Sequence, residues 1–268
     1  MPIGSSYVFI TKNMLSRSFF TLFGTPDLHT HIRLRPIIRF FEAYVNDREK
    51  MPIVVLELGC GSGIGAFEFS KIAIRRNNDL KYIGIDIDER EIRVANEILR
   101  LYKPHGSFAF HTGDALSFLE DNRSFKADVI LLADVIEHLE DPKRLLVAAN
   151  NALAEKGLLV ISVPTPLYRK MFGEKFHHKV GHVSNGYLLE NIDRLMLESG
   201  KDLTRITYKY NTGLFGAVGC WLYYNLFNID NRYFTFFKSA ILLPFAFLDF
   251  LNGSRVSCTL FAVYGKIR

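Results

Sequence analysis

From about residue 51 to residue 200, short apolar runs alternate with segments whose apolar residues recur every three or four positions. The short runs predict strands buried in a parallel sheet, and the longer periodic segments predict helices packed on that sheet. Strands are expected at 53–58, 82–86, 107–111, 128–133 and 157–163, and helices at 64–76, 89–102, 115–119, 142–154 and 185–199. This alternation predicts an α/β fold with helices on both faces of the sheet.

Both ends of the chain depart from this alternation. Residues 31–46 show helical spacing, with Pro36 expected in the first turn, where a proline is tolerated. We therefore predict an N-terminal helical extension over residues 1–50 and a main domain over residues 51–268. Within the main domain, two late strands are expected at 205–210 and 257–264, separated by a hydrophobic insertion at about 210–252.

The insertion is rich in Phe, Tyr and Leu, and residues 210–229 carry no charge over a length that would cross a bilayer. Glycines and asparagines interrupt this run, however, and Lys238, Pro244 and Asp249 break the next one. We do not predict a membrane-spanning helix. Two interpretations stay open for residues 210–251: a helical cap at a membrane surface, or packing in the core or against another subunit.

Composition limits the classes of partner that this protein can bind and the cellular compartments that suit it. The net charge of +5 is spread along the chain, whereas nucleic-acid binding proteins usually carry a basic stripe, so no nucleic-acid partner is expected. We interpret Arg33, Arg35 and Arg39 as a solvated helix face, with contact to an anionic substrate as the alternative. The three cysteines lack the spacing of metal ligands, and the chain does not start with a basic segment followed by an apolar core. Both observations predict a cytoplasmic protein. The protein would be peripheral to the membrane if the insertion faces lipid.

The first strand ends in a glycine-rich turn that predicts a cofactor site. Glu57 closes the strand, and Gly59, Gly61, Gly63 and Gly65 follow at alternate positions. Glycine lets the backbone adopt positive φ and approach a ligand closely. The segment also satisfies the dinucleotide pattern G-x-G-x-x-G/A. A carboxylate beside the turn favours a nucleoside that carries an amino acid.

Acidic residues also follow the next three strands. Asp86 ends the second strand, where a carboxylate can accept hydrogen bonds from both ribose hydroxyls; the alternative is a loop carboxylate. Asp114, next to the small Ala115, can hold the exocyclic amine of adenine; the alternative is a helix cap. Asp134 opens the segment Asp-Val-Ile-Glu-His-Leu-Glu-Asp-Pro after the fourth strand.

In this order and spacing, the motifs Glu-x-Gly-x-Gly-x-Gly, Gly-Ile-Asp, Gly-Asp-Ala and Val-Ile-Glu-His-Leu-Glu-Asp-Pro resemble those of class I S-adenosylmethionine-dependent methyltransferases. The most similar are the type 11/12 group, which includes the quinone-biosynthesis O-methyltransferases. The resemblance covers about residues 50–200 and the final strand. It implies S-adenosylmethionine as cofactor and a Rossmann-like, seven-stranded, mostly parallel sheet with an antiparallel last strand.

The resemblance also implies contacts to the cofactor by position. The methionine part and ribose would be surrounded by Glu57, Gly59, Gly61 and Gly63, and the ribose hydroxyls would be bound by Asp86. Adenine would contact Ile87, Asp114 and Ala115. The path to the sulfonium would be lined by Asp134 and Val135.

A second cluster is expected from Asp134, Glu137, His138 and His182. A helical turn over residues 134–138 would place Asp134, Glu137 and His138 on one face of the helix. Some relatives carry a Glu-x-x-Glu-His motif and a later histidine that bind metal, but here the first acid is Asp134. Three roles stay open: a site for a divalent ion such as Mg²⁺ or Mn²⁺, proton removal by His138 or His182 without metal, and a structural role. We assign His138 and His182 as the catalytic residues and assign no resident metal.

These features predict methyl transfer to an oxygen on a bulky, partly apolar acceptor, such as a lipid-linked glycan or a quinone precursor. Pro164-Thr-Pro166 predicts a stiff, extended exit from the fifth strand. The resemblance implies that this region lines the acceptor pocket, with Thr165, Tyr168 and His182 as candidate substrate contacts; the alternative is loop scaffolding. One alternative is a nicotinamide-dependent oxidoreductase, which would leave Glu57 and Asp114 unexplained. Another is a membrane-peripheral scaffold without catalysis, suggested by the insertion.

Overall fold

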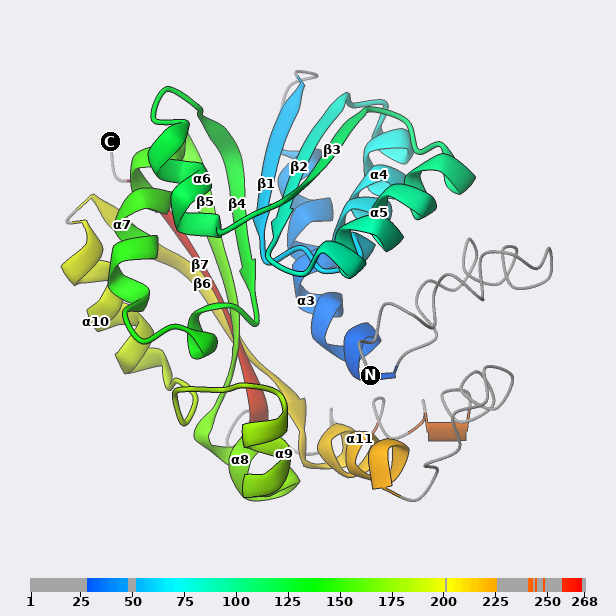
Figure 1. Ribbon diagram of the computed structural model, residues 1–268, viewed down its shortest axis with the longest axis vertical. Helices are drawn as coiled ribbons and strands as arrows, with labels where there is room; N and C mark the ends of the chain where they lie inside the picture. The colour runs from blue at the N-terminus through cyan, green and yellow to red at the C-terminus, as the bar shows by residue number, and fades with distance from the viewer. Residues whose placement is uncertain are drawn as a thin grey trace.

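A seven-stranded sheet in the order β3-β2-β1-β4-β5-β7-β6 forms the centre of the protein (Figure 1). The computed structural model describes residues 28–47, 52–200, 202–225 and 257–266, together with 241, 242, 244 and 248. The strands are β1 (Ile53–Leu58), β2 (Leu80–Asp86), β3 (Ser107–Thr112), β4 (Ala127–Ala133), β5 (Leu153–Pro164), β6 (Leu203–Gly213) and β7 (Ser257–Lys266). Strands β1 to β5 run parallel, and β7 lies antiparallel between β5 and β6. The predicted sheet, with its antiparallel last strand, is confirmed.

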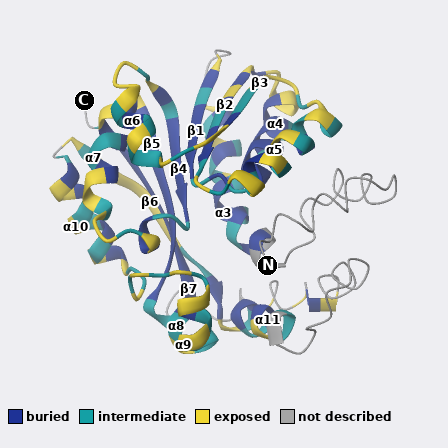
Figure 2. Ribbon diagram, in the orientation of Figure 1, coloured by how far each residue is buried: buried dark blue, intermediate teal, exposed yellow. Residues whose placement is uncertain are grey.

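Helices cover both faces of the sheet, as predicted. Because side chains alternate along a strand, Val55 and Val160 pack on one face, while Leu56 and Ile161 pack on the other. The first face carries α3 (Leu28–Asn46), α4 (Ile64–Arg76) and α5 (Glu89–Tyr102), and the second carries α6 (Ala115–Asp121), α7 (Pro142–Ala152) and α10 (Leu189–Ser199). Figure 2 shows the sheet as a buried layer between these helices.

The exit from β5 differs from the prediction of an extended segment. Two short helices follow the strand, α8 (Pro166–Phe172) and α9 (Glu174–Lys179). Pro166 occupies the first turn of α8, where the N–H that proline lacks would have no partner within the helix. The buried Thr165 donates a hydrogen bond through Oγ1 to the carbonyl of Ser257 at 2.5 Å, and so ties the start of α8 to β7.

Helix α3 begins earlier than the sequence predicts, at Leu28, so Pro36 lies inside the helix and not in its first turn. Without an N–H, Pro36 cannot donate to the carbonyl of Ile32. The side-chain amide of Asn211, from β6, donates to that carbonyl instead, at 2.7 Å. Leu34, Phe41 and the residues between them that face the sheet belong to the main core.

The hydrophobic insertion begins later than predicted. Strand β6 extends to Gly213, so residues 210–213 are strand and not insertion, and helix α11 (Leu214–Asn225) follows. Most of residues 226–256 lie outside the described residues, as do residues 1–27 of the predicted extension. Within the part of the chain that the structure describes, no helix combines the length and the apolar character needed to cross a bilayer.

Candidate active site

The loop between β1 and α4 forms one wall of a cavity of about 210 Å³. Gly59, Gly61 and Gly63 have φ angles of 79°, 50° and 73°, a region that residues with a Cβ rarely adopt. A Cβ on Gly59 would also clash with the side chain of Val135, so the loop can lie against the end of β4 only as glycine. The other residues that line the cavity include Thr30, Arg33, Glu57, Cys60 and Ser62.

Glu57 lies buried beneath this loop and accepts a hydrogen bond from the hydroxyl of Tyr82. Burial raises the pKa of Glu57 to about 8; the Tyr82 hydrogen bond opposes the shift, and the nearby charge of Asp86 adds to it. A cation that entered the cavity would favour the ionised form. Tyr82 was not among the predicted site residues, although a tyrosine in a buried strand needs a hydrogen-bond partner.

Asp86 holds the glycine loop from the end of β2. Its carboxylate accepts hydrogen bonds from the N–H groups of Gly61, at 2.7 Å, and Asp88, at 2.9 Å. Each carboxylate oxygen has a second lone pair, so these bonds leave capacity for two ligand hydroxyls. The neighbouring Ile87 is 78% exposed, so its apolar side chain is open to solvent, and its contact with adenine stays a prediction.

Asp114 caps helix α6. Its Oδ1 accepts hydrogen bonds from the N–H of Ser117 at 2.8 Å and from the Ser117 hydroxyl at 3.0 Å. The helix-cap alternative therefore describes its contacts, and the role of Asp114 and Ala115 at adenine stays a prediction. Both follow β3 and so belong to the edge of the sheet that carries Asp86.

Arg33 forms an ion pair with Asp134, with the two side chains 20% and 22% exposed. Asp134 adopts a φ of 55°, and its N–H donates to the carbonyl of Ser162 at 2.9 Å. The interpretation of Arg33 as part of a solvated helix face is wrong, because α3 places this guanidinium in the cavity wall. The sequence left contact with an anionic ligand only as an alternative for Arg33, because the docking of α3 is what brings this residue to the site.

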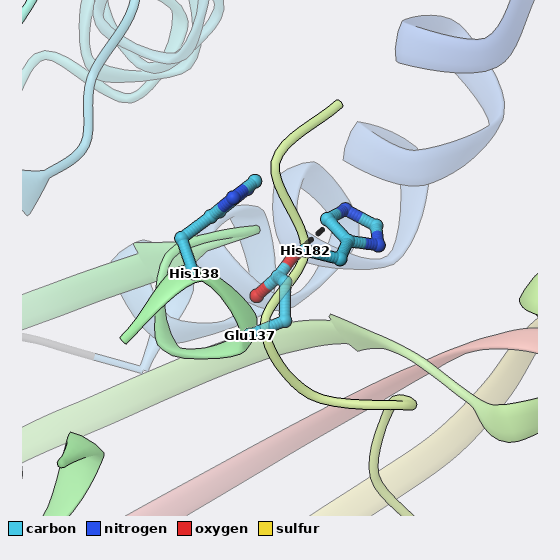
Figure 3. Close-up of side chains that lie close together, drawn as sticks. All are labelled: Glu137, His138 and His182. Atoms are coloured by element: carbon cyan, nitrogen blue, oxygen red, sulfur yellow. Dashed lines mark ion pairs between the residues drawn. The ribbon is translucent and has the colours of Figure 1, made fainter. Parts of the chain in front are cut away.

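Of the four residues expected to cluster after β4, the structure brings Glu137, His138 and His182 together and leaves Asp134 out. The helical turn after β4 spans Ile136–His138, so it begins after Asp134, which pairs with Arg33 instead. One ligand atom each from Glu137, His138 and His182 lie within 4.8 Å of one another (Figure 3). Glu137 is fully buried, and neither of its carboxylate oxygens has a hydrogen-bond partner among the described residues. Burial raises the pKa of this carboxyl to about 8.

The two histidines of the cluster lie in an aromatic environment. Nδ1 of His138 is 3.0 Å from the carbonyl of Gly181, so it acts as donor and leaves a lone pair on Nε2 of the neutral ring. The His182 ring centroid lies 4.9 Å from that of His138, 5.1 Å from that of His177 and 5.6 Å from that of Tyr168. The ring centroid of Phe172, from α8, lies 4.6 Å from that of Tyr168, so these two side chains form an aromatic wall beside His182.

Comparison with known proteins gives the same class of fold. The structure of the plantazolicin methyltransferase BamL, solved with S-adenosylhomocysteine (SAH), has a TM-score of 0.56 at 13% identity, over 99% of this chain and 97% of that one. A SAM-dependent methyltransferase from Archaeoglobus fulgidus has a TM-score of 0.54 at 17% identity, over 95% of this chain and 100% of that one. At these identities the likeness shows the fold alone.

Sequence comparison gives the family. A methyltransferase-domain family matches residues 29–211, which is more than half of the chain. Ajmaline N-methyltransferase from Rauvolfia serpentina is 28% identical over 106 residues, which span 40% of this chain and 34% of that protein.

The fold and the glycine-loop site define an S-adenosylmethionine-dependent class I methyltransferase. The chain belongs to the methyltransferase-domain family that matches it. Membership in this family decides against the nicotinamide-dependent oxidoreductase. The finer resemblance to quinone-biosynthesis O-methyltransferases stays a prediction.

Proposed function

We propose that this methyltransferase methylates a hydroxyl oxygen on a bulky, partly apolar acceptor, such as a quinone precursor or a lipid-linked glycan. The observation that carries the proposal is the position of the His138 and His182 imidazoles. His138 follows β4, whose last residue, Ala133, lines the cofactor cavity. Its ring packs against His182, which in turn packs against Tyr168 of the aromatic cluster with Phe172. Imidazole removes protons at neutral pH, and aromatic side chains bury apolar ligands.

The cavity suits the zwitterionic end of the cofactor. The methionine part carries a carboxylate and an ammonium group, and the cavity offers the guanidinium of Arg33 and the carboxyl of Glu57. Cofactor binding then places Gly59, Gly61 and Gly63 against the methionine and ribose, where a Cβ would obstruct the approach.

The remaining cofactor contacts follow the edge of the sheet. Asp86 accepts from the ribose hydroxyls, and Ile87, Asp114 and Ala115 surround adenine. Asp134 and Val135 border the sulfonium. The positions of these residues at the ends of β2, β3 and β4 support the assignment.

Chemistry at the acceptor needs one proton acceptor. A lone pair of the acceptor oxygen attacks the methyl carbon, the carbon–sulfur bond breaks, and SAH leaves as a thioether. The hydroxyl proton passes to Nε2 of His138, whose Nδ1–H is held by the Gly181 carbonyl. His182 packs against that ring. Because the sulfonium methyl is already electrophilic, alignment of the two reactants supplies much of the rate.

The surface of α11 supports an acceptor that carries a lipid. Leu214 is 39% exposed and Trp221 is 40% exposed, and both lie on a helix that carries no charged residue. Tryptophan is enriched at the level of lipid headgroups. We propose that α11 contacts the lipid part of the acceptor or the membrane surface that presents it.

The test supplies S-adenosylmethionine with a ¹³C-labelled methyl group together with a quinol, a lipid-linked glycan in vesicles, and an amine. We expect an O-linked methyl signal in the NMR spectrum of one of the two hydroxyl acceptors. His138→Ala should lower kcat by about 10²- to 10⁴-fold, the usual contribution of a general base, and rising pH should restore part of the loss. His178→Ala is the matched control, because His178 is an exposed histidine outside the cluster.

Two outcomes would contradict the proposal. Labelled methyl only on nitrogen would favour N-methylation, the activity in the name of the ajmaline relative. Binding of SAH and vesicles without turnover of any acceptor would favour the non-catalytic scaffold.

A further inference from the structure

We propose that the start of α3, residues 28–35, couples the occupancy of the cofactor cavity to the position of helix α11. This segment contacts both places. The residues of α3 that line the cavity are Thr30, Arg33 and Leu34. On another side of the helix, Ile32 is 5% exposed and packs with the fully buried Cys220 of α11. The inference rests on the proposed binding of the cofactor's methionine end in this cavity.

Pro36 separates this segment from the rest of α3. After Pro36 the helix is anchored in the main core, where the ring of Phe41 stacks on that of Phe69 with centroids 4.0 Å apart. The start of the helix points toward α11 and contacts it (Figure 1). Because proline has no N–H, the backbone bond from position 36 to the Ile32 carbonyl is missing. Helices bend at such positions, so residues 28–35 can shift while the core part of α3 stays in place.

Asn211 provides a second link between this segment and α11. Its side-chain amide donates to the carbonyl of Ile32 at 2.7 Å. Asn211 lies near the end of β6, the strand that leads directly into α11. The side chain of Ile32 therefore contacts α11 itself, and its carbonyl is bonded to the strand that positions α11.

Cofactor binding changes the contacts of the segment at Arg33. The Arg33 guanidinium forms an ion pair with Asp134, and the carboxylate of the cofactor's methionine end would replace Asp134 as its partner. A ligand shifts a conformational equilibrium only when it interacts differently with the two states, and this exchange of partners supplies the difference. Because Ile32 is the next residue on the same helix, a shift of Arg33 toward the ligand also moves Ile32 against Cys220.

Coupling between two sites is reciprocal. The factor by which the cofactor strengthens binding at α11 is also the factor by which a ligand at α11 strengthens cofactor binding. If the proposed contact of α11 with the acceptor holds, an acceptor in place would tighten the hold on the methyl donor.

Trp221 reports on α11 directly, because it is the single tryptophan of the chain and lies 40% exposed on that helix. Among the described residues, those that line the cavity come from α3, β1, the glycine loop, α4, α5 and β4, and none comes from α11. A response of Trp221 to a ligand in the cavity therefore reports transmission through the protein.

The test titrates SAH into the full-length protein and follows both the heat of binding and the emission of Trp221. We expect the emission to change with the same midpoint as the calorimetric curve. Ile32→Ala shortens the side chain that meets Cys220, and Asn211→Ala removes the donor to the Ile32 carbonyl. Each variant should still bind SAH but lose most of the emission change. Ile38→Ala is the matched control, because it makes the same truncation on α3 after Pro36, where the side chain packs on the main core.

Circular dichroism and the calorimetric curve establish that each variant is folded, and if Ile32→Ala does not fold, Asn211→Ala decides. SAH binding by the wild type without a change in Trp221 emission would overturn the inference. So would an undiminished change in both variants, or an equal loss in Ile38→Ala. These outcomes leave the proposed methyl transfer untouched. A folded wild type that binds no SAH would instead overturn both the inference and the proposed cofactor contacts, so the calorimetric curve distinguishes the two failures.

Failure of the acceptor assay alone leaves the fluorescence result standing, because the SAH titration involves no turnover.

Discussion

At the scale of single residues, Glu57 is held in a state that a ligand can change. Burial raises its pKa from 4.5 to about 8, although the Arg33 charge opposes the shift, so the carboxyl is mostly protonated at neutral pH unless a ligand cation binds beside it. In the unfolded chain the same carboxyl ionises near its ordinary pKa. Between these two pH values the folded state binds one more proton than the unfolded state, so rising pH lowers the free energy of unfolding.

Glu57→Gln should remove this pH dependence. Measured by urea unfolding without cofactor, the wild type should lose stability relative to Glu57→Gln as pH rises from about 4.5 to about 8, by at most about 1.4 kcal/mol per pH unit. Above about pH 8 the difference should level off. Parallel stability curves for the two proteins across this window would show that Glu57 does not titrate abnormally.

Residues of the site were predictable where their role is local to a motif. Gly59, Gly61 and Gly63 follow one strand and need no distant partner to take positive φ. Arg33 was misinterpreted because its position in the cavity wall depends on how α3 docks, and Asp134 was misplaced because Arg33 pairs with it. The spacing of residues along the chain does not predict the place of Arg33 in the cavity wall or its ion pair with Asp134.

At the scale of elements, helix α3 continues through a proline because a distant strand replaces the missing hydrogen bond. Asn211 of β6 donates to the Ile32 carbonyl that an N–H at position 36 would otherwise serve. The same bond joins α3, which carries Arg33, to the edge of the sheet. The stability of α3 is therefore coupled to β6.

A double-mutant cycle measures this coupling. Asn211→Ala should cost about 1–3 kcal/mol of unfolding free energy, the penalty for leaving a partly buried carbonyl without a donor. In the Pro36→Ala background the backbone N–H at position 36 can serve Ile32, so the same substitution should cost much less. Chemical denaturation of the four proteins gives the interaction energy. An equal cost of Asn211→Ala in both backgrounds would contradict the account.

Most strands and helices of the sheet region follow from the alternation of apolar patterns, and the errors have identifiable causes. Pro164 and Pro166 suggested an extended exit, yet a proline in the first turn begins α8. The uncharged run from residue 210 contains both the end of β6 and α11. The absence of charge suggested one insertion from about residue 210, but the strand continues through Asn211 and Thr212 to Gly213.

At the scale of the whole molecule, three parts of the chain meet at one cavity. The glycine loop follows β1, Ala133 ends β4, and Arg33 belongs to α3, which precedes β1 in the chain. We propose that this cavity binds the methionine end of S-adenosylmethionine, with Arg33 at the carboxylate and Glu57 at the ammonium group. Arg33 pairs with Asp134, and the cofactor carboxylate would compete with Asp134 for the guanidinium.

The most direct test is calorimetric titration of SAH and of methylthioadenosine, which lacks the amino-acid end, into the wild type, Arg33→Gln and Arg39→Gln. Arg39 lies exposed on the same helix and serves as the control. We predict one SAH per wild-type chain, and a loss of SAH affinity of about 10- to 100-fold in Arg33→Gln, as for a hydrogen bond to a charged group. Methylthioadenosine affinity should be unchanged in both variants. A folded wild type that does not bind SAH, or an Arg33→Gln variant that binds it like the wild type, would contradict the account.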